Sequence, residues 1–153
     1  MQQSTTPTPS SSFTFTVLGK PAPQGSKRHV GRGVMVESSK RCKPWRQDVR
    51  HTALDLHPED WYANMDAAIS ISVVFVFARP KNHFRTNGQL KPSAPTYCTA
   101  RIGDVDKLAR SILDSLAGVL FAADEQVINL IAQKRYANDR EQPCAIITVS
   151  AVS

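Results

Sequence analysis

RIGDVDKLARSILDSLAGVLFAADEQV, residues 101–127, sets an apolar segment between acidic residues in a chain of net charge +6. Leucine and isoleucine recur through it at helical spacing, which predicts a helix over 107–116 with one apolar face. Asp106 is a good N-cap for that helix, and Gly118 suits the position after its end. The next residues, VINLIAQKRYA (127–137), have the composition of a strand. This stretch therefore predicts a helix followed by a strand.

The same reasoning extends to the rest of the chain. Alternating or β-rich patterns predict further strands at 13–19, 67–78 and 144–152, and helical spacing predicts a helix at 44–56. The order strand, helix, strand, helix, strand, strand is typical of an α+β domain, here with a mixed sheet of about four strands and two main helices. Residues 31–42 are expected to form a hairpin or flap. Residues 79–100, with three prolines and a glycine, predict a long loop.

Length and composition indicate which class of protein this is. With 153 residues, 41% hydrophobic and 21% charged, the chain fits one globular domain. Residues 1–12 are rich in Ser, Thr, Pro and Gln and are expected to be a disordered tail before a domain over 13–153. There is no apolar run long enough to cross a bilayer and no secretory signal. Three widely spaced cysteines indicate reduced thiols, so we expect a cytoplasmic protein without a membrane partner.

Positive charge is concentrated in two segments. Residues 20–50 hold nine Lys or Arg against two acids, and residues 79–101 hold five against none. Such segregation indicates a surface that binds a polyanion such as nucleic acid. The alternative is a solvated basic face that only improves solubility.

Three aspartates form the candidate acidic site. Asp104 and Asp106 are separated by one residue, so an extended backbone would point both side chains to the same side. Asp124 follows the helix, and we expect the returning chain to bring it beside the helix start. Carboxylates gathered in this way repel one another unless a cation neutralises them, and oxygen ligands are those that Mg²⁺ prefers. The alternative is that Asp106 only caps the helix, Asp104 pairs with Arg101 and Asp124 lies in a solvated turn.

Two motifs resemble those of the RusA family of Holliday-junction resolvases. One is Asp104-Val105-Asp106-Lys107-Leu108, followed after an apolar linker by Asp124-Glu125-Gln126-Val127. The other is the upstream GKPAPQGSKR at 19–28, similar to the family's entry motif. The resemblance covers about residues 13–150.

This resemblance implies a structure-selective endodeoxyribonuclease that resolves four-way DNA junctions by paired nicks in recombination and repair. It implies Mg²⁺, with Mn²⁺ as a substitute, bound by Asp104, Asp106 and Asp124. The family's essential lysine corresponds to Arg110, which we expect to stabilise the transition state; its alternative is a salt bridge to Asp106 or to Asp114. The two-fold symmetry of a junction favours a homodimer. Such enzymes occur in bacterial cells and often in phages or prophages.

The pattern departs from the family at three positions, since Lys107 replaces an asparagine, Arg110 a lysine and Ala123 an acid. A non-catalytic DNA-binding protein, a less selective nuclease of flaps or branched DNA, and an interaction module whose acids only cap helices therefore remain alternatives. Phe84, in the basic loop, is a candidate to insert at a branch point. The basic residues expected to contact DNA are Lys27, Arg28, Arg32, Lys40, Arg41, Lys43, Arg46, Arg85, Lys107 and Lys134.

Overall fold

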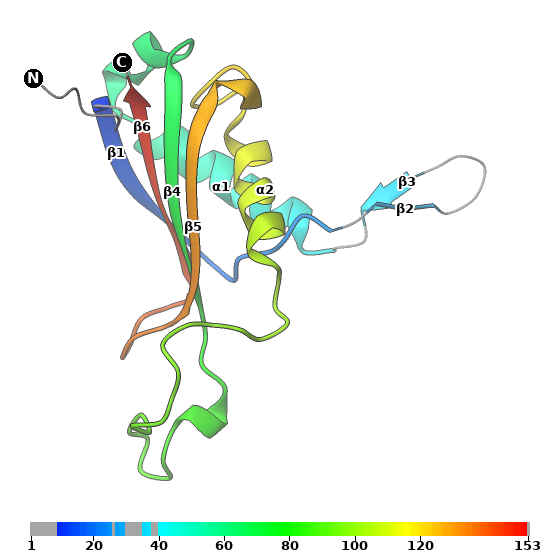
Figure 1. Ribbon diagram of the computed structural model, residues 1–153, viewed down its shortest axis with the longest axis vertical. Coiled ribbons are helices and arrows are strands. Elements are labelled where there is room, and N and C mark those ends of the chain that lie inside the picture. Colours follow the sequence, from blue (N-terminus) through cyan, green and yellow to red (C-terminus); the bar gives the residue numbers. More distant parts are fainter. Residues whose placement is uncertain (1–8, 26, 30–34, 38–39, 153) are drawn as a thin grey trace, which may run out of the picture.

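Four strands form the main sheet in the order β1-β6-β4-β5 (Figure 1). They are β1 (Pro9–Leu18), β4 (Ala68–Phe77), β5 (Val127–Tyr136) and β6 (Cys144–Val152). β6 pairs antiparallel with both β1 and β4, and β4 pairs parallel with β5. The computed structural model describes residues 9–25, 27–29, 35–37 and 40–152. The predicted α+β fold with a mixed four-stranded sheet and two main helices is confirmed.

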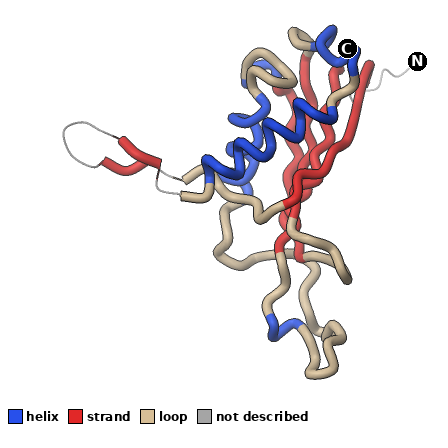
Figure 2. The backbone as a smooth tube through the Cα atoms, turned by 180° about the vertical axis from the view of Figure 1, so that it is seen from behind, coloured by secondary structure: helices blue, strands red, loops and turns tan. Residues whose placement is uncertain are grey.

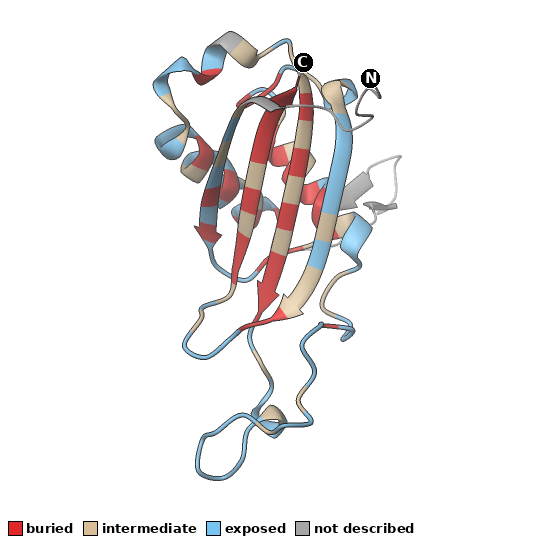
Figure 3. Ribbon diagram, turned by 60° about the vertical axis from the view of Figure 1, so that its left-hand side comes forward, coloured by how far each residue is buried: buried red, intermediate tan, exposed pale blue. Residues whose placement is uncertain are grey.

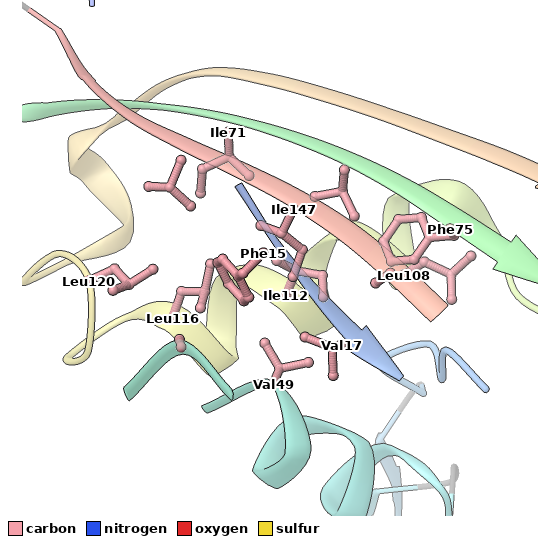
Figure 4. Close-up of a cluster of buried hydrophobic side chains, with 14 of the residues drawn as sticks. Phe15, Val17, Val49, Ile71, Phe75, Leu108, Ile112, Leu116, Leu120 and Ile147 are labelled. Carbon is pink, nitrogen blue, oxygen red and sulfur yellow. The ribbon is translucent and has the colours of Figure 1, made fainter. Parts of the chain in front are cut away.

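Both main helices, α1 (Cys42–Leu56) and α2 (Val105–Leu116), lie on one face of this sheet (Figures 1 and 2). Burial alternates along β4, because successive side chains of a strand point to opposite faces (Figure 3). The buried set meets the apolar faces of the helices in a single core, where Phe75, Leu108 and Ile147 are fully buried (Figure 4). On the other face, residues such as Thr14 and Thr148 pair through their hydroxyls, 2.8 Å apart.

Two segments extend from this core. Strands β2 (Lys27–His29) and β3 (Met35–Glu37) pair antiparallel beside the start of α1 (Figure 1). A hairpin was predicted within residues 31–42; β3 lies in that range, but β2 precedes it. The long loop 79–100 extends past one end of the sheet and contains only the short helix η2 (Lys81–His83). Two further short helices, η1 (Glu59–Asn64) and η3 (Asp124–Gln126), precede β4 and β5. No helix in the described part of the chain is long and apolar enough to cross a membrane.

Two predicted boundaries were wrong. β1 begins at Pro9, so residues 9–12 belong to a strand that pairs with β6, while residues 1–8 of the predicted tail lie outside the described residues. The N-cap of α2 is Asp104 and not Asp106, because Asp104 keeps an extended backbone (φ −72°, ψ 144°) and its carbonyl already accepts the first helical hydrogen bond from Leu108. Gly118 does follow the C-cap with φ 82°, as predicted.

Candidate active site

Asp104 and Asp106 begin α2 with exposed side chains. Asp104 is extended, but Asp106 already lies in the first helical turn, so the two do not share the strand-like spacing that the sequence predicted. The Asp104 side chain makes no capping hydrogen bond. Among the described residues, neither carboxylate forms an ion pair, so the alternative pairing of Asp104 with Arg101 is not observed. Both acids are therefore open to a ligand from solvent.

Gly103 fixes the approach of the chain to this acidic pair. Its φ is +133°, a conformation that side chains rarely adopt. A Cβ atom here would lie 3.2 Å from the Leu108 side chain and 3.3 Å from that of Pro23. Only glycine lets the backbone turn into α2 at this point, and the glycine directly before the first acid was a signal that the sequence reasoning did not use.

The GKPAPQG loop, residues 19–25, lies against the same end of α2. The Gln24 amide donates to the Lys107 carbonyl at 2.9 Å, and Pro23 packs against Gly103. The two motifs that carried the family resemblance are therefore neighbours in space. Lys107 itself is half-buried at this contact.

The start of α1 contacts the loop 19–25 at this end of the molecule. Arg41 donates to the carbonyl of Lys20 at 2.9 Å, and the Cys42 thiol donates to the Gln24 side-chain oxygen at 3.3 Å. These contacts bring the basic residues at the start of α1 to the same end as the acidic pair; Lys40, Arg41 and Lys43 are exposed and Arg46 is half-buried. Of the other predicted DNA contacts, Lys27 and Arg28 are on β2, Arg85 is exposed in the loop 79–100, and Arg32 lies outside the described residues.

Lys134, on β5, contacts the residue that precedes the acidic pair. Its ammonium donates a hydrogen bond to the carbonyl of Gly103 at 3.0 Å, and its side chain is half-buried. This places a fixed positive charge beside the residue that precedes Asp104.

Arg110 lies one helical turn beyond Asp106 and is exposed. Its Nε lies 3.7 Å from an oxygen of Asp114, with 64% of the Arg110 side chain and 24% of the Asp114 side chain exposed. The alternative pairing with Asp114 is therefore present, while no ion pair joins Arg110 to Asp106 among the described residues. Asp114 holds the guanidinium on the helix surface and leaves most of it accessible.

Asp124 lies at the opposite end of α2, at the start of η3 (Figure 1). β5 runs from that end back to Lys134, which contacts Gly103, so Val127 and Gly103 are separated by about 20 Å of strand. Ligands of one Mg²⁺ lie about 2 Å from the ion. Across the described residues there is no group of three His, Cys, Asp or Glu side chains that can share a metal. The expectation that the returning chain brings Asp124 beside the helix start is wrong. α2 and β5 run in opposite directions, so β5 starts beside the end of α2, and Asp124, which directly precedes β5, lies there.

Gln126 explains how the turn that carries Asp124 is held. Its amide nitrogen donates to the carbonyls of Met65 and Ala67 at 2.7 and 2.9 Å, and its oxygen accepts from the Ala123 amide at 2.7 Å. The sequence reasoning used Gln126 only to align motifs. In the structure it ties the turn at 123–126 to the start of β4.

One comparison identifies the family. The family model for endodeoxyribonuclease RusA matches residues 19–149, from the loop that packs against the start of α2 into β6. None of the curated proteins matches the chain. Nucleases of the matched family are generally metal-dependent and act on branched DNA. The chain belongs to the RusA family of Holliday-junction endodeoxyribonucleases.

Proposed function

We propose that this protein resolves four-way DNA junctions by Mg²⁺-dependent paired nicks, as a homodimer in which each active site takes acidic residues from both copies. The observation that carries the proposal is the exposed pair Asp104 and Asp106, free of ion pairs with described residues, with Lys134 bound to the carbonyl of the preceding Gly103.

The acidic pair fits a divalent cation. Its oxygens are hard donors and are open to solvent, which suits Mg²⁺ and, as a substitute, Mn²⁺. Asp104 and Asp106 would hold the ion together with Asp124. When bound, the ion would supply Lewis-acid stabilisation of charge on the phosphate and on the leaving oxygen.

The open edge of β5 supports a dimer. β5 is the last strand of the sheet, and its outer edge before Lys134 pairs with no other described strand. Three of its apolar residues are exposed: Ile128 by 55%, Leu130 by 41% and Ile131 by 58%. Unpaired apolar edges favour pairing with another strand, and a two-fold axis makes such pairing antiparallel.

Antiparallel pairing of two β5 strands would also complete the acidic site. The Asp124 end of one strand would lie beside the Lys134 end of the other, and Lys134 contacts Gly103. Asp124 would then approach the partner subunit's Asp104. A site shared between two copies requires Asp124 to lie far from Asp104 of its own chain, as it does here.

The chain's own cations would act on the phosphate. Arg110, held by Asp114, would contact the scissile phosphate and offset the negative charge that grows in the transition state. Hydrolysis adds water across the P–O3′ bond, so that one product carries a 5′-phosphate and the other a 3′-hydroxyl. Lys40, Arg41 and Lys43 would bind the phosphates of a DNA arm without reading its sequence.

Two copies related by a two-fold axis match the symmetry of a four-way junction, since each copy would nick one of two equivalent strands. Such DNA arises in recombination and repair, so we place the protein in the cytoplasm of a bacterial or phage-infected cell.

The test uses an end-labelled four-way junction with the purified protein, with and without Mg²⁺. We expect symmetric nicks in two opposed strands with Mg²⁺ only, and no nicks from Asp104→Asn, which should still bind the junction. Tight binding without nicking in either Mg²⁺ or Mn²⁺ would indicate a non-catalytic binding protein. Equal cleavage of junction, flap and linear duplex would indicate a less selective nuclease.

A further inference from the structure

A cavity of about 450 Å³ lies between the long loop 79–100 and the turn at 137–141. Its volume is in the range of about 300–1,000 Å³ typical of ligand sites. The residues that line it include Phe84 and Leu90 from the loop, and Asn138 and Arg140 from the turn. None of the candidate catalytic residues lines this cavity.

The walls of this cavity are held in place by the structure. Arg79 donates from Nε to the Ala137 carbonyl at 2.8 Å and from Nη1 to the Pro95 carbonyl at 2.7 Å, and its guanidinium lies 5.4 Å from the centre of the Tyr136 ring. These contacts join the two ends of the loop to the end of β5. The cavity therefore does not have to be assembled when a ligand binds.

The tip of the loop is also ordered by its backbone. Phe84 and Leu90 form an antiparallel bridge, and the Arg85 amide donates to the Gln89 carbonyl at 2.7 Å. Phe84 is 38% exposed and Leu90 44% exposed. The bridge thus presents an aromatic ring and an aliphatic side chain next to each other at a wall of the cavity.

The charges around the cavity favour a neutral planar group inside it and a phosphate outside. Two acids, Asp139 and Glu141, and two cations, Arg79 and Arg140, line the cavity, so the charges of its lining balance. The rest of the loop is basic, since residues 79–101 carry five Lys or Arg and no acid, and of these only Arg79 lines the cavity. A DNA base attached to its phosphates has this distribution of charge.

The position of the cavity relates it to the acidic pair. Lys134, which contacts Gly103, and Ala137, which lines the cavity, are about 10 Å apart along the end of β5. A base drawn into the cavity would therefore belong to a nucleotide only a few positions from the phosphate at Asp104.

We propose that this cavity binds one unstacked DNA base from the branch point of the junction, with the base against Phe84 and with Gln89 and Asn138 available to its polar edge. The inference rests on the proposed function, because it requires branched DNA on this face. Bases at a branch point lose stacking partners more easily than bases within a duplex, so withdrawing one costs less there. Arg140 adds a cation at the rim; its φ of +62° is unusual for a residue with a side chain.

The test places the fluorescent base 2-aminopurine, which brightens when it is unstacked, at each branch-point position of a junction. Binding is measured without Mg²⁺, so that no cleavage occurs. Branch-point positions of the junction occur in pairs related by its two-fold axis. We expect the wild-type protein to raise the fluorescence at the two positions of one such pair and not at the others. Phe84→Ala should abolish this rise and weaken junction binding about 10-fold, because stacking on an aromatic ring is worth that order. Tyr62→Ala, which removes an aromatic ring that is 54% exposed on η1, is the matched control and should behave as the wild type.

A second arm separates this inference from the proposed function. A trinucleotide that contains 2-aminopurine is titrated into wild-type protein, Phe84→Ala and Arg140→Gly, a substitution that suits the positive φ. We expect binding by the wild type, loss in Phe84→Ala and weakening in Arg140→Gly. Failure of the junction to be nicked, with this trinucleotide result intact, would overturn the nuclease and leave the base site standing. Nicking of the junction, with no response at any branch-point base and equal trinucleotide binding by wild type and Phe84→Ala, would overturn the base site alone.

Discussion

The ammonium of Lys134 lies 3.0 Å from the carbonyl oxygen of Gly103 and donates a hydrogen bond to it. Through this contact Lys134, on β5, holds the backbone that leads into Asp104. Lys134 therefore has two possible uses, to position the acidic pair or to bind a DNA phosphate directly, and these uses predict different kinetics.

Lys134→Met should reduce the nicking rate about 10- to 100-fold at saturating junction while affinity changes little, because groups that orient metal ligands have effects of that size. Single-turnover cleavage and equilibrium binding measured on the same junction check this. Lys134→Arg, which keeps a donor and a charge, should recover part of the rate. The alternative outcome is weaker binding with an unchanged rate at saturating junction. The slope of the logarithm of the binding constant against the logarithm of the salt concentration would then fall by about one, and Lys134 would be assigned to a phosphate contact.

Mixing two inactive variants tests whether sites are shared between copies. Asp104→Asn and Asp124→Asn should each be inactive alone. If each site takes Asp104 from one copy and Asp124 from the other, a mixed dimer has one intact site. Random exchange makes about half of the dimers mixed, so about a quarter of the wild-type sites should return. Nicking of a labelled junction after subunit exchange measures it, and no recovery in demonstrably mixed dimers would place all three acids in one chain.

A charged substitution on the edge of β5 tests whether this edge forms the dimer interface. Ile131→Asp places a carboxylate on the exposed strand edge and should convert the dimer to monomer and remove nicking, while the fold persists because Ile131 is 58% exposed. Sedimentation and circular dichroism report the two properties separately. Leu56→Asp is the control, since Leu56 is 56% exposed at the end of α1 and should leave the dimer intact. A dimer that survives Ile131→Asp would require another interface.

The fold was largely predictable because its signals are local. The β-branched and aromatic run at 67–78 and the helical spacing at 107–116 correspond to β4 and α2 within two residues. The start of β1 was missed because Pro and Ser, which make up residues 9–12, are common in loops, and pairing with β6 makes this segment a strand. The cap of α2 was misplaced because both Asp104 and Asp106 have the composition of an N-cap, and the turn at Gly103 decides between them.

The site was less predictable because it depends on chain direction. The motif spacing located Asp104, Asp106 and Asp124 in the sequence, but nothing local reveals that β5 starts at the far end of α2. The same limit applies to the cavity, whose walls come from segments about fifty residues apart and are joined by Arg79. Tertiary pairing supplies this information, and single-sequence patterns do not contain it.

Gln126→Ala should lower the free energy of unfolding by about 1–3 kcal/mol, because it leaves the carbonyls of Met65 and Ala67 without these donors. Urea denaturation measures the loss. Glu125→Ala, an exposed neighbour, should stay within about 0.5 kcal/mol of the wild type. If the turn also sets the position of Asp124, Gln126→Ala should slow nicking under conditions where it remains folded. Equal stability of the two variants would show that the turn is held by other contacts.

Glu141→Gln tests the ion pair beside the cavity through its pH dependence. Arg135 donates two hydrogen bonds to Glu141, at 2.6 and 2.9 Å, and these hold the pKa of the Glu141 carboxyl below its usual value of 4.5. Because the folded pKa is the lower one, the pair stabilises the fold above pH 4.5 and loses this contribution as the pH falls through the folded pKa. Glu141→Gln should therefore lower stability at pH 7 by about 1 kcal/mol.

The difference in thermal midpoint between Glu141→Gln and the wild type should be about 3 °C at neutral pH and should shrink towards zero in acid. Asp139→Asn, an exposed neighbour on the same turn, serves as the control and should follow the wild type at every pH. A difference for Glu141→Gln that stays constant down to the acid limit would mean that the glutamine side chain disturbs the turn itself. In that case the carboxylate charge is not what fixes the wall of the cavity.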